Sequence, residues 1–230
     1  ELAIAANEHG AKGAVGIITD VHTGEVLGMA SWPTFDRNRR SAAVDGATLN
    51  RATSAHYEMG SVFKTFTVAA GIDTGRADMD TVFDASVPFM IGNRRISDFH
   101  AQNRAMTLEE VYLHSSNIGT SRLAVEMGGD TMRRYFKNLG LLDAAPIELK
   151  ESARPIVPRE WSDTTLASLS FGYGISITPV QMAAAMGALT NGGHYVPLTL
   201  RKGGAGERIE PRRVISEQTS LTLLDLMRRN

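Results

Sequence analysis

The sequence has 230 residues, 43% of them hydrophobic and 21% charged, which is the composition of an ordinary globular protein. Its net charge of −1 argues against binding to nucleic acid, and no run of eighteen apolar residues or signal-peptide pattern predicts a membrane span or an export signal in this chain. Cysteine is absent and the six histidines lack metal-ligand spacing, so we expect no thiol chemistry, no metal and no cofactor.

The first fifty residues predict the end of a helix, a hairpin and a loop. Residues 1–12 carry a helical apolar pattern. Two apolar runs, 13–20 and 25–30, flank a short turn that contains Gly24 and are typical of a β-hairpin. The polar stretch that follows, to about residue 50, predicts a solvated loop with three exposed arginines, Arg37, Arg39 and Arg40.

Residues 61–74 predict a helix buried at the centre of the domain, because almost every side is apolar and Gly75 stands where a C-cap glycine belongs. Ser61 and Lys64 are three residues apart and share one face of this helix. Burial and the helix N-terminus both lower a lysine pKa, so this pair suggests a nucleophile beside a general base. Alternatively, Ser61 is an N-cap and Lys64 extends to the surface, which a lone Ser-x-x-Lys favours.

The middle of the chain predicts short strands followed by helices. Residues 76–104 are loop-like with extended pieces at 81–83 and 95–97. Thr107 and Glu110 form a capping-box pattern at the start of a helix. Two further helices are expected over 120–127 and 131–139.

The last third predicts two strong helices. Residues 144–159 read as extended, 162–170 are ambiguous, and 171–176 form a glycine-spaced turn. Thr178 and Pro179 begin a helix that runs to residue 189. The remaining expectations are a strand over 195–200, a surface loop over 203–206 and a helix over 217–227.

Ser115-Ser116-Asn117 supplies a second chemical element between two helical segments. The Ser115 hydroxyl can relay a proton, and the Asn117 amide offers donors and an acceptor to a peptide-like substrate. Ser-x-Asn alone is common as a helix cap, but its order after a buried Ser-x-x-Lys is much more specific.

At this point the chain resembles the transpeptidase domain of class B penicillin-binding proteins, most closely the division-specific (septal) branch. Four segments carry the resemblance: residues 24–33 (GEVLGMASWP), 57–64 (YEMGSVFK), 114–119 (HSSNIG) and 171–179 (FGYGISITP). The resemblance covers nearly the whole chain. It implies an α/β (α+β) fold like that of serine β-lactamases, an antiparallel sheet flanked by helical layers.

One departure concerns the family's third motif, Lys-Thr/Ser-Gly on an edge strand, because no such triplet occurs here. We therefore expect residues 1–230 to be a partial transpeptidase domain without its last strands, its membrane anchor and its N-terminal pedestal. An oxyanion-hole donor and the carboxylate-binding lysine would then be missing, so the 230-residue chain is expected to be weakly active or inactive.

The resemblance also implies roles for single residues. Ser61 would attack the penultimate D-alanine carbonyl of a peptidoglycan stem peptide, and Lys64 would accept its proton. Ser115 would pass a proton to the leaving D-alanine, and Asn117 would hold the substrate amide. β-Lactams would acylate the same serine.

Two further residues are candidate substrate contacts. Tyr173 is either an aromatic wall of the cleft or core filler. Glu58 either steadies the cleft entrance or is an exposed carboxylate that favours the helix dipole. His114 is interpreted as a helix-face histidine, since the lysine already fills the role of base.

The resemblance further implies a protein of the bacterial inner membrane with its catalytic domain on the periplasmic face, working with division-machinery membrane proteins that include a glycan polymerase. Two alternatives stay open. One is a hydrolase on the same scaffold, a serine β-lactamase or D,D-carboxypeptidase. The other is a non-catalytic penicillin-binding sensor.

Overall fold

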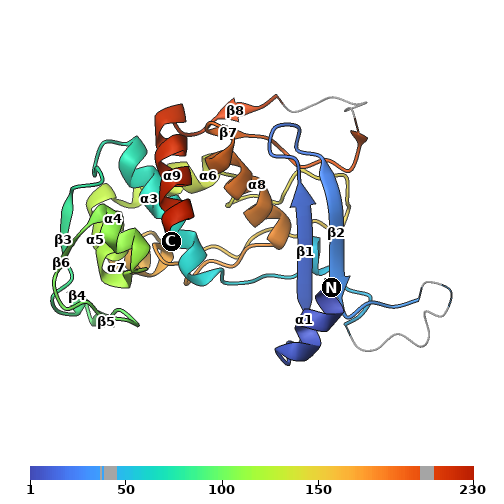
Figure 1. Ribbon diagram of the computed structural model, residues 1–230, viewed down its shortest axis with the longest axis horizontal. Coiled ribbons are helices and arrows are strands. Elements are labelled where there is room, and N and C mark those ends of the chain that lie inside the picture. Colours follow the sequence, from blue (N-terminus) through green and yellow to red (C-terminus); the bar gives the residue numbers. More distant parts are fainter. Residues whose placement is uncertain (37, 39–45, 203–209) are drawn as a thin grey trace.

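The computed structural model describes residues 1–36, 38, 46–202 and 210–230. The predicted loops at Arg37, Arg39 and Arg40 and at residues 203–206 lie outside these ranges. In the described part, most helices gather on one side and the N-terminal hairpin stands on the other, with the first helix at its foot (Figure 1). None of the described helices is both long and apolar enough to cross a bilayer.

The helical elements are, in chain order, α1 (Leu2–Glu8), α2 (Arg51–Ser54), the 3₁₀ turn η2 (Gly60–Phe63), α3 (Lys64–Asp73), α4 (Leu108–Leu113), α5 (Asn117–Met127), α6 (Gly129–Asn138), α7 (Asp163–Leu169), α8 (Pro179–Thr190) and α9 (Glu217–Arg229). The strands are β1 (Ala14–Thr19), β2 (Val26–Trp32), β3 (Val82–Asp84), β4 (Phe89–Ile91), β5 (Arg94–Ile96), β6 (Ala105–Thr107), β7 (His194–Tyr195) and β8 (Arg212–Arg213). They pair antiparallel as β1–β2, β3–β6, β4–β5 and β7–β8, four two-stranded sheets within the described residues.

The predicted hairpin is confirmed as β1 and β2, paired from Ala14 with Trp32 to Thr19 with Val26. Helices α1, α2 and α8 pack against it. An apolar groove of about 400 Å³ lies between β1 and α8 and is lined by Val15, Ile17 and Met182, among others. The hairpin thus depends on helices for its support, since two strands alone are marginally stable.

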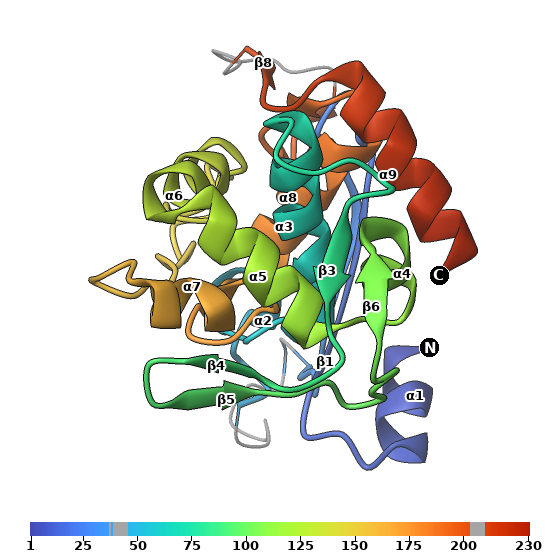
Figure 2. The same ribbon diagram turned by 90° about the vertical axis from the view of Figure 1, so that its left-hand side faces the viewer.

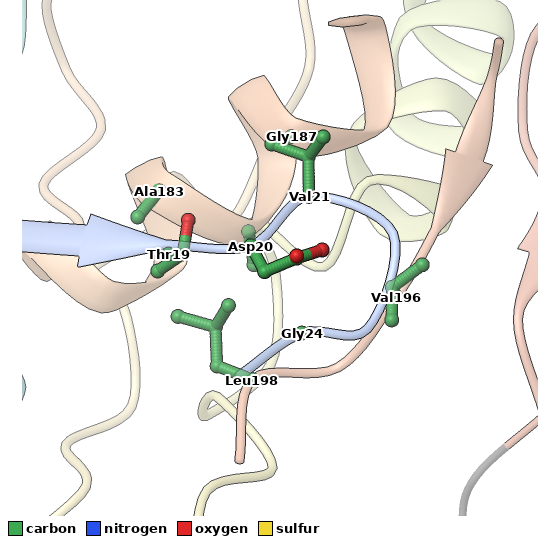
Figure 3. A pocket seen from close by; sticks show the side chains of 9 residues that line it. Thr19, Asp20, Val21, Gly24, Ala183, Gly187, Val196 and Leu198 are labelled. Carbon is green, nitrogen blue, oxygen red and sulfur yellow. The ribbon is translucent and has the colours of Figure 1, made fainter. Parts of the chain in front are cut away.

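The turn of the hairpin docks on α8 and on residues 196–198 (Figure 3). The Asn191 side chain donates to the Val21 carbonyl at 2.8 Å, and a cavity of about 10 Å³, room for one water molecule, remains between the surfaces. Gly24 has φ +75° and its hypothetical Cβ would lie 2.1 Å from the Pro197 oxygen. Only glycine fits this contact.

The predicted central helix is confirmed as buried, but it begins differently from the prediction. Residues 60–63 form the 3₁₀ turn η2, and α3 starts at Lys64. Eight of the ten residues of α3 are buried. Phe63 packs edge-to-face on Phe66 and on Phe136 of α6, which fixes the first turn against the core. Helices α4, α5, α6 and α9 surround α3 (Figure 2).

The connection from α4 to α5 is short. The capping box of Thr107 and Glu110 is confirmed at the start of α4. The next helix was expected from residue 120, whereas α5 already begins at Asn117, because Ser116 is its N-cap and accepts from the Gly119 N–H at 3.0 Å.

Among the C-terminal elements, the ambiguous residues 162–170 form α7, and the helix after Pro179 is confirmed with a capping box of Thr178 and Gln181. The last predicted helix is also confirmed, as α9. The predicted strand over 195–200 is wrong in extent: β7 covers only His194–Tyr195, and Thr199 instead forms a bridge with Glu25. The predicted segment therefore pairs partly with β8 and partly with Glu25, and local sequence does not encode this division.

Candidate active site

Lys64 is buried at the first position of α3, with 2% of its surface exposed. Burial lowers the pKa of Lys64 to about 8, and the carboxylate of Asp98 offsets part of this effect. A lysine with such a pKa is partly an uncharged amine near neutral pH and can therefore accept a proton. The alternative in which Lys64 extends to the surface is wrong, because α3 is enclosed by other helices.

The Lys64 ammonium nitrogen contacts two serines. It lies 3.2 Å from Ser61 Oγ, 2.8 Å from Ser115 Oγ and 2.5 Å from the Ser115 carbonyl oxygen. Ser61 is exposed, and its side chain makes no N-cap hydrogen bond to the helix. The predicted cluster therefore forms: a solvent-accessible hydroxyl stands in front of a buried amine, and a second hydroxyl contacts that amine.

Ser115 reaches Lys64 because the chain reverses at the end of α4. Its N–H donates to the Tyr112 carbonyl, the Ser116 N–H donates to the Val111 carbonyl, and Ser115 itself takes φ +53°. A serine in this left-handed region is uncommon. Both its carbonyl and its hydroxyl contact Lys64, so the unusual backbone conformation is tied to the site.

Asn117 is placed at the same corner but has a different partner. Its side-chain nitrogen donates to the carbonyl of Ser97 at 3.0 Å, which fixes the amide at the start of α5. The structure thus brings Ser61, Lys64 and Ser115 into direct contact, and holds Asn117 next to them through the chain.

Glu58 and Tyr173 lie where two segments meet. Glu58 Oε1 accepts from the Gly174 N–H at 2.8 Å, and Tyr57 and Ile177 form an antiparallel bridge. The glycine-spaced turn therefore lies beside the segment that leads into Ser61. Tyr173 is 54% exposed, which rules out the core-filler interpretation. His114 is exposed at the end of α4, as expected of a helix-face histidine.

Asp98 was not identified from the sequence. Its carboxylate accepts from Ser116 Oγ at 2.7 Å and from the Ile118 N–H at 2.9 Å. It lies in the loop after β5, eighteen residues before its partner Ser116, and no local pattern marks it. Within the described residues, no group of three or more histidines, aspartates or glutamates is arranged to hold a metal ion.

The comparisons with solved structures define the class of fold. An apo structure of the TP domain of penicillin-binding protein 3 from Burkholderia pseudomallei superimposes with a TM-score of 0.86 at 26% identity, over 99% of this chain and 65% of that one. The fold is that of penicillin-binding-protein transpeptidase domains, a β-lactamase-like mixture of helices and small antiparallel sheets, as predicted.

The family follows from the sequence comparisons. The family model "Penicillin binding protein transpeptidase domain" matches residues 14–230. The probable peptidoglycan D,D-transpeptidase FtsI of Caulobacter vibrioides is 54% identical over all 230 residues, and the FtsI of Escherichia coli K12 is 32% identical over 210 residues, 89% of this chain. The chain belongs to the penicillin-binding protein transpeptidase family. It spans 39% and 35% of the lengths of these two relatives.

Proposed function

We propose that this chain carries the acylating half of a peptidoglycan D,D-transpeptidase that cross-links stem peptides during cell division and is inhibited by β-lactams. The observation that supports this most is the buried Lys64 amine within hydrogen-bond distance of the exposed Ser61 hydroxyl and of Ser115. The names of the relatives, which are peptidoglycan D,D-transpeptidases, agree with this proposal.

In the first proposed step, Ser61 Oγ attacks the carbonyl carbon of the penultimate D-alanine while its proton passes to the neutral amine of Lys64. A carbon–oxygen bond forms and the negative charge moves to the carbonyl oxygen. The Ser61 backbone N–H, in the first turn of η2, has no partner within that helical turn and is proposed as one donor to this oxyanion.

In the second proposed step, the carbon–nitrogen bond breaks and the terminal D-alanine leaves as an amine. Its proton comes from Lys64 through the Ser115 hydroxyl, which contacts the amine at 2.8 Å. An amine of a neighbouring stem then attacks the acyl-enzyme carbonyl. A new amide bond forms, the ester bond to Ser61 Oγ breaks, and the proton of the amine returns to Ser61. Asn117 is proposed to hold the substrate amide, and Tyr173 and Glu58 to border the cleft.

The setting of the reaction is also proposed from family membership. Residues 1–230 would form part of a transpeptidase domain on the periplasmic face of a bacterial inner membrane. Its partners would be division-machinery membrane proteins, among them a glycan polymerase. Support comes from the likeness to the septal branch and from the 54% identity to an FtsI protein.

The test is acylation by a fluorescent penicillin, with the modified peptide mapped by mass spectrometry. We expect slow labelling of Ser61 that Ser61→Ala abolishes and that Ser86→Ala, a change at an exposed serine elsewhere, leaves unchanged. Labelling that persists in Ser61→Ala would contradict the assignment. Rapid release of hydrolysed penicillin would instead favour the β-lactamase or carboxypeptidase alternative.

A further inference from the structure

The loop after β5 holds the second serine element through three consecutive residues. Asp98 accepts from Ser116 Oγ at 2.7 Å and from the Ile118 N–H at 2.9 Å, and the Ser97 carbonyl accepts from the Asn117 side chain at 3.0 Å. Positions 116, 117 and 118 are therefore all tied to residues 97–98. Ser115, immediately before them, is bound to Lys64.

These bonds restrict the backbone that connects α4 to α5. Ser116 is 1% exposed, and its hydroxyl both donates to Asp98 and accepts from the Gly119 N–H at 3.0 Å. The Asp98 carboxylate stands at the N-terminus of α5, where the helix dipole favours a negative charge. The charge, the cap and the side-chain bond thus coincide at Ser116, the residue next to the Ser115 that contacts Lys64.

Asp98 also acts on Lys64 through its charge. Burial lowers the pKa of Lys64, and the negative charge of Asp98 raises it, so that the ammonium form is partly stabilised. The lowering of the Lys64 pKa follows from its enclosure by helices. The raising follows from the Asp98 carboxylate, which is held by Ser116 and Ile118.

The other charged groups on the elements around α3 are engaged elsewhere or exposed. The paired ones are Glu110 with Arg104, Glu109 and Asp225 with Arg229, Asp73 with Tyr135, Lys137 with Asp143, Arg122 over the Phe89 ring and Arg134 over the Tyr135 ring. The exposed ones are His114, Glu126, Asp130, Arg133, Glu217 and Arg228. Within the described residues, Asp98 is the group whose charge acts on Lys64.

We propose that Asp98 is a positioning residue of the acyl-transfer site, which orients Ser115 and Asn117 through Ser116 and Ile118 and places a negative charge on Ser116, next to the Ser115 that contacts Lys64. The inference rests on the proposed function, because it concerns the same Ser61–Lys64–Ser115 site. It assigns both a geometric and an electrostatic role to a loop outside the four positions Ser61, Lys64, Ser115 and Asn117.

The test compares two variants that separate charge from geometry. Asp98→Asn keeps the shape and a hydrogen-bonding oxygen but removes the charge, whereas Ser116→Ala removes one bond to Asp98 and keeps the charge. The readout is the rate of acylation by a fluorescent penicillin as a function of pH. In the wild type this rate should rise with pH, reach half of its plateau near pH 8, where half of the Lys64 amine is neutral, and level off at higher pH.

We expect Asp98→Asn to move the rising limb to lower pH by about half a pH unit or more, because loss of the negative charge lowers the pKa of Lys64 further. Its plateau rate should fall about tenfold, since a charge-assisted bond is weakened. Ser116→Ala should lower the plateau but leave the limb in place, and Asp98→Glu should restore the limb. If the acylation rate of Asp98→Asn rises over the same pH range as that of the wild type, the proposal is overturned, because a merely structural residue changes only the plateau rate.

A second readout separates this proposal from the proposed function. The pKa of Lys64 is measured by NMR of ¹³C-labelled lysine, with its signal identified by its loss in Lys64→Met. If the wild type is acylated at a residue other than Ser61, the proposed function fails, and the titration still decides about Asp98. A pKa of Lys64 that is lower in Asp98→Asn supports the proposal, and an unchanged value overturns it.

Discussion

Lys64 illustrates how a single buried side chain acts on both chemistry and stability. Its amine has three oxygen partners from two serines, yet enclosure by helices lowers its pKa to about 8 against an ordinary 10.5. A protein pays in folding free energy for an amine that must partly give up its proton on burial. The loss of the proton also makes the amine available as a base.

This cost depends on pH in a direction that can be worked out. Between about pH 8 and 10.5 the unfolded chain keeps the Lys64 proton and the folded chain does not, so stability rises with pH across this window. At pH 7 the penalty reaches about 3 kcal/mol, taking about 1.4 kcal/mol for each pH unit between the two pKa values. We predict that Lys64→Met is more stable than the wild type at pH 7, by about 1–3 kcal/mol after loss of the serine contacts, and that its stability lacks this rise.

The measurement is denaturant unfolding at pH 7, 8, 9 and 10 for the wild type, Lys64→Met and Lys12→Met. Lys12 is exposed, so its variant should follow the wild type at every pH. If the curves for Lys64→Met and Lys12→Met run parallel, Lys64 is not the source of the pH dependence. The difference between variants removes the contribution of other groups that titrate in alkali.

The start of η2 depends on a glycine more than a hundred residues away. Gly172 has φ +83°, and its hypothetical Cβ would lie 2.4 Å from the Gly60 oxygen and 2.8 Å from the Phe63 Cβ. These are atoms of the turn that presents Ser61. The glycine-spaced turn therefore packs directly against the backbone of the turn that contains Ser61. Glu58 accepts a hydrogen bond from the Gly174 N–H of the same glycine-spaced turn.

Gly172→Ala and Gly174→Ala form a matched pair for this contact. Both positions have a positive φ, but a Cβ at Gly174 meets nothing within 4 Å. We predict that Gly174→Ala costs about 1 kcal/mol of stability, and that Gly172→Ala costs at least about 2 kcal/mol more because backbone atoms must move. Acylation at Ser61 should fall about 10²-fold in Gly172→Ala alone, as expected for a nucleophile displaced by about an ångström.

Thermal melts and penicillin acylation of the two variants provide the check. Equal losses of stability and of acylation rate in both would mean that the Gly172–Gly60 approach has no special effect on the site.

Local patterns predicted the elements that are defined by neighbours in sequence. The β1–β2 hairpin, the capping box at Thr107 and the buried α3 follow from alternation, cap chemistry and an all-round apolar surface. The pairing of Ser61 with Lys64 was predicted because three residues span one helical turn. Ser115 was predicted as a proton relay from the Ser-x-Asn element between two helical segments, and the family resemblance added its role toward the leaving D-alanine.

Other features depend on contacts across the molecule. The strand β4 has only three residues, and its pairing with β5 leaves little trace in composition. Ser61 was expected as the first residue of a regular helix, but the packing of Phe63 against Phe66 and Phe136 accompanies a 3₁₀ turn there. Asp98 carries no helical or strand signal that ties it to Ser116, and only the folded loop reveals that contact.

The uneven distribution of burial has a consequence for how the molecule opens. No residue of β1 or β2 is fully buried, and Ile18 and Leu27 are 65% and 64% exposed, whereas α3 is enclosed almost throughout. Because an apolar groove separates part of β1 from α8, the hairpin makes fewer contacts with the helices. Amide deuterium uptake should therefore be much faster in residues 14–32 than in residues 64–73.

Deuterium uptake followed by mass spectrometry of proteolytic peptides checks this expectation, and equal protection of the two segments would contradict it. If it holds, the hairpin separates from the helices in brief local excursions while the Lys64–Ser115 contact persists. The protein would then combine a flexible N-terminal hairpin with a rigid core, and transient local opening of the hairpin would leave the reactive centre assembled.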